Sequence, residues 1–296
     1  MRNSTGVVPK RGIYSLMRDI SVTAVTESVQ RLCIRANNHL PADVKQALVT
    51  SRQNEPWPVA HDILGKIIQN YELADQTDSP ICQDTGMACV FLEIGQEVHL
   101  IDGDLSEAVN EGVRQGYREG CLRKSVVGDP LKRNNTGDNT PALLYIDMVP
   151  GDRLGITVVA KGFGSENMSR IAMLRPSDGK EGVVDFVLTT IEAAGPNPCP
   201  PIVVGVGIGG SFDKVALAAK KALIRPLDVK NHDPFYAHLE AELLEKINAL
   251  GIGPQGFGGA TTALSVAVET VPTHIAALPC AVNINCHVTR HASEVL

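Results

Sequence analysis

The sequence predicts an α+β (mixed α/β) fold in which mixed and antiparallel sheets are surrounded by helices. Three observations predict this fold class. Amphipathic helical segments alternate with short apolar strands, hairpin-like stretches are mixed with β–α–β stretches, and there is no fixed-period repeat. The 296 residues are 44% hydrophobic and 20% charged, which is typical of a globular chain that buries a sizeable core.

The elements are predicted from apolar spacing and from the residues that begin or end helices. A loose N-terminal arm is expected over residues 1–20, followed by one domain, or two lobes, over residues 21–296. Asp104 is the expected N-cap of one helix, and Gly251 is expected to end another. Helices are expected over residues 22–40, 41–53, 58–76, 104–120, 179–195, 212–223 and 233–251. Strands are expected over residues 87–95, 201–206, 260–271 and 275–284.

One hairpin is expected in the middle of the chain. Residues 141–162 contain two apolar runs separated by Pro150-Gly151-Asp152, a typical turn sequence. The two runs should therefore pair directly as antiparallel neighbours.

Composition and charge exclude several classes of function. The net charge of -6 argues against a nucleic-acid binder, which normally carries a basic face. No stretch of about 18 apolar residues is present, so no membrane-spanning segment is expected. The N-terminus contains no apolar signal-peptide core, which favours the cytoplasm. In a reducing compartment the seven cysteines are expected to be thiols or metal ligands, not disulfides.

Three of the cysteines occupy polar or turn-like surroundings at the ends of predicted elements. Cys82 lies in a polar loop before a strand, Cys199 lies between prolines before a strand, and Cys286 lies where an apolar strand becomes polar. Three thiolates on one iron–sulfur cluster leave one iron open to a substrate. The alternative is that these cysteines are buried and inert.

The other four cysteines favour the inert interpretation. Cys33 lies on a helix face, Cys89 lies within an apolar strand, and Cys280 has apolar neighbours that would raise the pKa of a thiol. Cys121 opens a loop, and the sequence assigns it no role.

A glycine-rich stretch offers a competing interpretation. Residues 205–210, GVGIGG, match a dinucleotide-binding loop between a strand and a helix, and Asp228 lies near the distance expected of a ribose contact. However, Pro226 and Pro234 interrupt the strand that this acid should close. The alternative is a glycine turn that packs a helix on a strand.

Several polar residues are candidate site residues. Asp84 is a candidate general acid or base, and Arg123 is a donor suited to a carboxylate. The amides of Gly162 and Gly164, in KGFGSEN, could bind a carboxylate, and His274 lies at a strand end. Each has a simpler interpretation as a solvated side chain, a turn or a local hydrogen-bonding group.

The motifs together resemble a known family. PICQDTG, LRKS, NNTGDNTPA, SENMSR, AGPNPCPPIVVGVGIGG, LGIGPQG and NINCH are spread over roughly residues 20 to 292. They resemble the alpha subunit of two-subunit class I fumarate hydratase, an oxygen-sensitive iron–sulfur hydro-lyase. A neighbouring relative is the alpha subunit of L-tartrate dehydratase.

The resemblance implies a site and a partner. It implies a [4Fe–4S] cluster held by Cys82, Cys199 and Cys286, with its open iron acting as a Lewis acid. It implies that Asp84 acts as acid or base with a threonine of the partner. Further substrate-binding positions match Gln83, Arg123, Gly162, Gly164 and His274. The resemblance places the remaining cationic groups on a beta subunit, in a heterotetramer that binds a small dicarboxylate.

Two positions bear on the choice of substrate. Relatives carry three glycines where this chain has Gly162-Phe163-Gly164, so Phe163 is expected to alter the amide contacts of that loop and to narrow the pocket. Tartrate relatives tend to have an aromatic residue directly after the third cysteine, where this chain has His287. The resulting prediction is reversible hydration of fumarate to (S)-malate. The alternatives are tartrate dehydration and, from GVGIGG, a dinucleotide-binding oxidoreductase.

Overall fold

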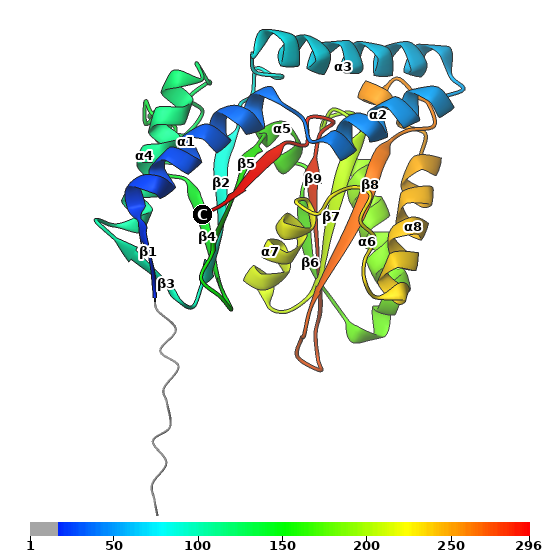
Figure 1. The fold of residues 1–296 in the computed structure, drawn as a ribbon. Helices are drawn as coiled ribbons and strands as arrows, with labels where there is room; N and C mark the ends of the chain where they lie inside the picture. The colour runs from blue at the N-terminus through cyan, green and yellow to red at the C-terminus, as the bar shows by residue number, and fades with distance from the viewer. Residues whose placement is uncertain (1–16) are drawn as a thin grey trace, which may run out of the picture.

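The computed structural model describes residues 17–296, which form two four-stranded sheets, a two-stranded sheet and surrounding helices (Figure 1). The predicted N-terminal arm lies almost entirely outside the described residues. Its last residues belong to strand β1 (Arg18–Ser21), which pairs in parallel with β3 (Val98–Ile101). The mixed α/β class predicted from the sequence is confirmed.

The first sheet has the strand order β10-β5-β2-β4. Its strands are β2 (Met87–Gly95), β4 (Leu143–Val149), β5 (Leu154–Lys161) and β10 (His291–Val295). Helices α1 (Val22–Asn38) and α4 (Leu105–Glu119) pack on it and share one apolar core with it. The Asp104 side chain accepts a hydrogen bond from the Glu107 N–H (2.9 Å), which confirms Asp104 as the N-cap.

The hairpin predicted over residues 141–162 is wrong. Strand β2 lies between its two arms, parallel to β4 and antiparallel to β5. Residues 95–97, at the end of β2, also lie between the ends of β4 and β5, because their amides donate hydrogen bonds to carbonyls of the turn at 149–153. The physical reason is burial: β2 is almost wholly buried and takes a central position, whereas β4 is half exposed and suits an edge.

The second sheet has the strand order β6-β9-β7-β8. Its strands are β6 (Arg170–Leu174), β7 (Ile202–Gly209), β8 (Ala263–Val271) and β9 (Leu278–Asn285). Helices α6 (Gly179–Ala194) and α8 (Pro234–Ala249) share a core with one face, and α7 (Phe212–Ala222) packs on the other.

The glycine-rich stretch belongs to strand β7 and is not a nucleotide-binding loop. Gly205 and Gly207 lie within this buried strand, and the chain turns only at Gly209-Gly210, where φ is 89° and 74°. A Cβ on Gly207 would overlap the Val215 carbonyl oxygen of α7. The glycines therefore allow α7 to approach the sheet closely, and the dinucleotide interpretation is wrong.

A pair of helices covers one end of the second sheet (Figure 1). Helix α2 (Ala42–Asn54) contacts β8, α3 (Pro58–Thr77) packs on α2, and the chain then runs from α3 to β2. Short helical turns are α5 (Phe163–Glu166) and the 3₁₀ segments Pro176–Asp178 and Pro254–Gly256. Within residues 17–296, the helices are all too short or too polar to cross a membrane.

Candidate active site

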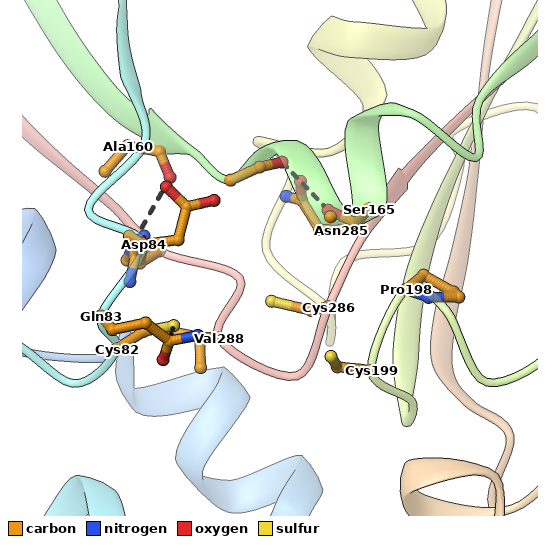
Figure 2. Close-up of a pocket in the computed structure, with 13 residues that line it drawn as sticks. Cys82, Gln83, Asp84, Ala160, Ser165, Pro198, Cys199, Asn285, Cys286 and Val288 are labelled. Carbon is orange, nitrogen blue, oxygen red and sulfur yellow. Dashed lines mark hydrogen bonds between the residues drawn. The ribbon is translucent and has the colours of Figure 1, made fainter. Parts of the chain in front are cut away.

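A pocket lies where the two sheets meet, beneath α2 and α3 (Figure 2). It gathers residues that are up to about 200 positions apart in the sequence, because each lies at the end of a strand or helix. Most of the predicted site residues line it: Cys82, Gln83, Asp84, Gly162, Gly164, Cys199 and Cys286.

The two halves of the molecule contribute different parts of the pocket. The first half supplies the loop that holds Cys82 and Asp84, between α3 and β2. The second supplies Cys199 before β7 and Cys286 after β9. The register of β7 and β9 pairs Val203 with Asn285, so both cysteines lie at the same edge of the sheet. There the Cys199 carbonyl oxygen accepts a hydrogen bond from the backbone N–H of the residue after Cys286 (3.4 Å).

The Asp84 carboxylate is held by two backbone amides. Its Oδ1 accepts a hydrogen bond from the Gly86 N–H (2.9 Å), and its Oδ2 accepts one from the Phe163 N–H (2.9 Å). Hydrogen bonds to an ionised carboxylate are strong and fix its orientation. Phe163 thus acts through its amide, while its side chain is 40% exposed and does not line the pocket. The expected narrowing of the pocket by Phe163 is wrong.

Arg290 is a pocket residue that the sequence analysis missed. It is 3% exposed, its Nε donates to the Ala160 carbonyl (3.3 Å), and its Nη2 donates to the Asp84 carbonyl. Its guanidinium therefore ties the Asp84 loop to β5 beside Cys286. In the sequence, Arg290 is distinguished only by its position four residues after Cys286. An arginine in such a polar segment would ordinarily be expected to be exposed to solvent.

The causes that shift the pKa of a cysteine thiol differ between the pocket and the core. Burial raises the pKa of the Cys286 thiol, but the charges of Arg290 and Lys161 and a backbone hydrogen bond oppose that effect. Burial, and then the neighbouring Cys82, raise the pKa of Cys199. Unopposed burial raises the pKa of Cys33 and Cys280 to about 12, so both remain protonated thiols.

Cys89 and Cys121 also lie away from the pocket. Cys89 is in the first sheet, and burial is the main reason that its pKa is raised to about 11. Cys121 is an exposed thiol with φ of 51° at the end of α4.

The three cysteine thiols of the pocket suit an iron–sulfur cluster better than a single metal ion. Over residues 17–296, no three His, Cys, Asp or Glu side chains converge closely enough for one metal ion. The thiols of Cys82, Cys199 and Cys286 instead surround one pocket from three separate loops (Figure 2). An iron–sulfur cluster accepts such spacing, because each thiolate binds a different iron. These three residues would hold the cluster.

Arg123 and His274 do not line the pocket. Arg123 has an exposed side chain, although its carbonyl accepts a hydrogen bond from Thr85 Oγ1 (3.0 Å) and its loop therefore adjoins Asp84. His274 follows β8, whose last residue, Val271, pairs with Gly209 at the opposite end of the second sheet. The eight residues of β7 separate these ends by about 26 Å.

Comparison with protein families identifies the group to which this chain belongs. Residues 26–295 match the family model described as "Fumarate hydratase (Fumerase)". The chain belongs to the class I fumarase family. It is a hydro-lyase-type alpha subunit, and members of this family typically use an iron–sulfur cluster.

The similar class I fumarase-family proteins carry a more specific name. The "Putative L(+)-tartrate dehydratase subunit alpha" of Methanocaldococcus jannaschii is 43% identical over 274 residues, covering 90% of this chain and 96% of the relative. The "L(+)-tartrate dehydratase subunit alpha" of Escherichia coli strain UTI89 is 32% identical over 277 residues, covering 92% and 91%. The protein of the same name from strain K12 is 31% identical over 277 residues, with the same coverage. The names of these relatives describe each of them as the alpha subunit of a larger enzyme.

Proposed function

We propose that this chain is the alpha subunit of a hydro-lyase that acts on a small four-carbon dicarboxylate at a [4Fe–4S] cluster. The observation that carries the proposal is one pocket that is lined by three thiols and a fixed carboxylate. Cys82, Cys199 and Cys286 hold the cluster, and Asp84 is the acid–base group. When bound, the cluster supplies a Lewis-acidic iron that makes hydroxide a viable leaving group.

In this proposal, residues of this chain transfer the substrate proton and orient the substrate. Asp84 takes the proton from the carbon next to the one that loses its hydroxyl, and returns it in the reverse direction. Its two amide donors, Gly86 and Phe163, keep the carboxylate aimed at one point of the pocket. Gln83, which also lines the pocket, offers an amide that can both donate and accept hydrogen bonds to orient a substrate carboxylate.

L(+)-tartrate is the first candidate substrate, in place of the fumarate predicted from the sequence. Its support is the name shared by relatives that are 31% to 43% identical over at least 90% of this chain. Malate and fumarate remain the second candidate because of His287. Its Nδ1 lies 3.0 Å from the Cys199 carbonyl and 3.2 Å from Gln255 Nε2, contacts that an apolar aromatic ring cannot make.

A beta subunit completes the site in this proposal. Among the described residues, Arg290 is the one cationic side chain that lines the pocket, and its Nε and Nη2 are bonded to backbone carbonyls, which leaves only Nη1 without a partner. A dicarboxylate needs further cations, which we assign to the partner in a heterotetramer. Arg123, beside the Asp84 loop, is placed to join them at the rim. His274 lies at the other end of the second sheet and has no role in this pocket in the proposal. An oxygen-sensitive cluster also fits the cytoplasm.

The experiment is anaerobic co-purification of this chain with its beta-type partner. Iron content, visible absorption and turnover are measured with L(+)-tartrate, D-tartrate, malate and fumarate. We expect a brown protein that bleaches in air, with the highest kcat/KM on L(+)-tartrate. A higher value for malate and fumarate would move the assignment to the second candidate. A colourless, iron-free complex with no activity on any of the four would overturn the proposal.

A further inference from the structure

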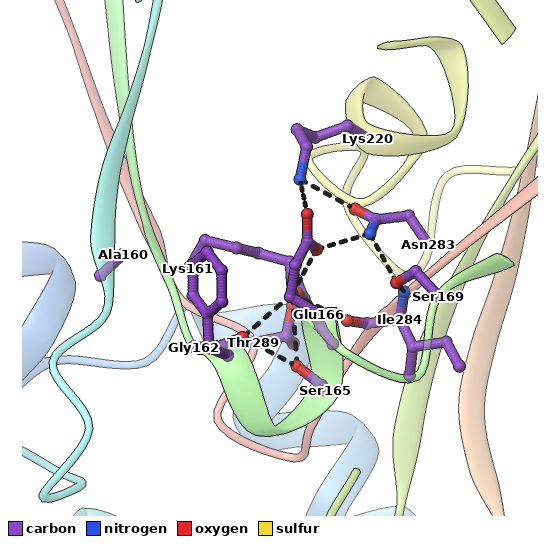
Figure 3. Close-up of polar contacts among 12 residues, drawn as sticks. Ala160, Lys161, Gly162, Ser165, Glu166, Ser169, Lys220, Asn283, Ile284 and Thr289 are labelled. Carbon is purple, nitrogen blue, oxygen red and sulfur yellow. Dashed lines mark hydrogen bonds and ion pairs between the residues drawn. The ribbon is translucent and has the colours of Figure 1, made fainter. Parts of the chain in front are cut away.

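A buried lysine connects the two halves of the pocket. Lys161 is the last residue of β5 in the first sheet and is 2% exposed. Its Nζ donates to the Ile284 carbonyl of β9 in the second sheet (2.9 Å), and lies 3.2 Å from Ser165 Oγ and 3.3 Å from the Gly162 carbonyl (Figure 3). One side chain therefore contacts both the turn at residues 162–166, whose Phe163 amide donates to Asp84, and the strand that ends before Cys286.

The backbone of Lys161 fixes the Asp84 loop as well. Lys161 pairs with Met87 at the start of β2, and Gly86 packs directly against it. A Cβ on Gly86 would lie 2.6 Å from the Lys161 carbonyl oxygen, so only glycine fits there, at a φ of 73°. The Gly86 amide in turn holds Asp84 Oδ1. The backbone of Lys161 thus contacts the Asp84 loop at Gly86 and Met87, while its ammonium group reaches β9 of the second sheet.

A carboxylate and a second lysine hold this ammonium group in place. Glu166 Oε2 lies 3.1 Å from Lys161 Nζ, and Glu166 Oε1 lies 2.7 Å from Lys220 Nζ. Burial alone would raise the pKa of Glu166, but the two ammonium charges and hydrogen bonds outweigh it and lower the pKa to about 2. The carboxylate is therefore ionised and lies between the two ammonium groups. Burial lowers the pKa of Lys161, and the charge of Glu166 opposes that effect.

The network also anchors β9 at its polar end. Asn283 Nδ2 donates to Glu166 Oε2 (2.6 Å) and to Ser169 Oγ (2.8 Å), and the Ile284 N–H lies 3.2 Å from the same hydroxyl. Lys220 Nζ adds a contact to Asn283 Oδ1 (3.3 Å). The residues just before Cys286 are thus held by several directional bonds that apolar packing alone would not supply.

We propose that Lys161, locked by Glu166 and Lys220, is a positioning residue that sets the spacing between Asp84 and Cys286. This inference rests on the proposed function, in which those two residues are the acid–base group and a cluster ligand. Lys161 does not line the pocket, so it acts through Gly162, Ser165 and Ile284. Removing it should loosen one half of the pocket relative to the other while leaving every ligand present.

The test compares two pairs of buried charges. The first variant is Lys161→Met with Glu166→Gln, which removes the charge of the buried lysine together with that of its carboxylate partner. Lys220, whose side chain is 15% exposed, keeps its hydrogen bond to Asn283. The matched control is Arg225→Met with Glu240→Gln. Arg225 and Glu240 form another buried ion pair, with side chains 15% and 8% exposed, and neither lines the pocket. Both variants are prepared anaerobically with the beta-type partner.

Four quantities are measured for each variant: iron per chain, the rate of iron loss to a chelator, kcat and KM. For the Lys161 variant we expect iron loss at least about tenfold faster and kcat at least about tenfold lower, the scale typical of residues that orient metal ligands, with KM changed less. The control should lose thermal stability but keep the wild-type iron-loss rate and kcat. Equal iron-loss rates and equal kcat in both variants would overturn the proposal.

Two further measurements keep the test decisive. If the double variant does not fold, Glu166→Gln alone, which preserves side-chain shape, is held to the same criteria. If the wild-type complex contains no iron, the proposed function fails, and amide hydrogen exchange of the metal-free complex decides the inference separately. Faster exchange in residues 162–166 and 283–286 together, relative to the control, would support it. Unchanged exchange in both segments would refute it.

Discussion

Cys280 and Cys286 lie six residues apart, near the two ends of strand β9, and their surroundings are opposite. Cys280 is fully buried in the core that the second sheet shares with α6 and α8. Cys286 lies just past the strand, in the pocket between the sheets, with Arg290 also in the lining. Burial raises the pKa of both thiols, but only at Cys286 do neighbouring positive charges oppose it.

The comparison shows that the end of a strand, not the residue type, makes a cysteine available for chemistry. Inside the sheet, a thiol is an apolar side chain that fills space, and ionising it would place an unpaired charge in a dry core. At the strand end, the backbone opens to a pocket and cationic side chains can reach it. The predictions below are directed at this contrast.

The largest effect is expected for Cys286→Ser. Serine does not replace a thiolate as an iron ligand, so the variant should lose the brown chromophore, most of its iron and its activity. Iron analysis and visible spectra of anaerobically prepared complex are the measurements, and Cys280→Ala serves as the matched control. Wild-type iron content in Cys286→Ser, together with iron loss in Cys280→Ala, would reverse the contrast between the two ends of β9.

Asp84→Asn should separate the chemistry of the pocket from its assembly. Asparagine cannot accept the substrate proton, so turnover should fall on the order of 10²-fold or more, while iron content and spectrum stay unchanged. Steady-state kinetics and iron analysis test this. Asp213→Asn, at the exposed start of α7, is the control carboxylate and should behave as wild type. Near-normal turnover by Asp84→Asn would remove Asp84 from the mechanism.

Two glycine substitutions compare the backbone inside the second sheet with the backbone at the pocket. In the second sheet, Gly207→Ala would push a methyl group into the α7 carbonyl of Val215, and overpacking of this kind should lower the free energy of unfolding by about 3 kcal/mol. At the pocket, a Cβ on Gly162 meets Asp84 Oδ2 at 3.4 Å, an ordinary contact. Gly162→Ala should therefore alter turnover more than stability. Urea denaturation and kinetics of both variants check this, and equal stability losses would contradict it.

Acid should weaken the junction between the sheets through Glu166. The pKa of this carboxyl falls from 4.5 to about 2 on folding, so its stabilising contribution is present above pH 4.5 and is lost as the pH falls towards 2. The contribution is at most about 3 kcal/mol. Denaturation of metal-free wild type and Glu166→Gln across that window measures it. The variant should lack this part of the pH dependence; parallel curves would show that Glu166 is not paired as described.

The smallest effect is expected for Cys280→Ala. Removing a buried sulfur leaves a small cavity among apolar side chains, which should lower the free energy of unfolding by about 1–2 kcal/mol. Iron content and turnover should remain near wild type, because Cys280 does not line the pocket. Thermal denaturation and iron analysis test both statements. A change in iron content would mean that the core end of β9 also controls the site.

The sequence by itself determined the local features of this protein. Apolar spacing and capping residues placed the main helices, and the N-cap at Asp104 was predicted correctly. Their places at the ends of predicted elements, in polar or proline-flanked segments, marked Cys82, Cys199 and Cys286 as candidates, and the structure brings all three to one pocket. These features depend on residues within a few positions of one another, so short windows of sequence carry the necessary information.

Only the tertiary structure decided the features that depend on distant partners. It placed β2 between two strands expected to pair, and it buried the GVGIGG stretch inside a strand. It showed Lys161 bonded to a carbonyl 123 residues away, and Arg290 bonded to the Asp84 loop 206 residues away. Such contacts leave no local periodicity in the sequence, because strand order and the burial of charge depend on the packing of the whole chain.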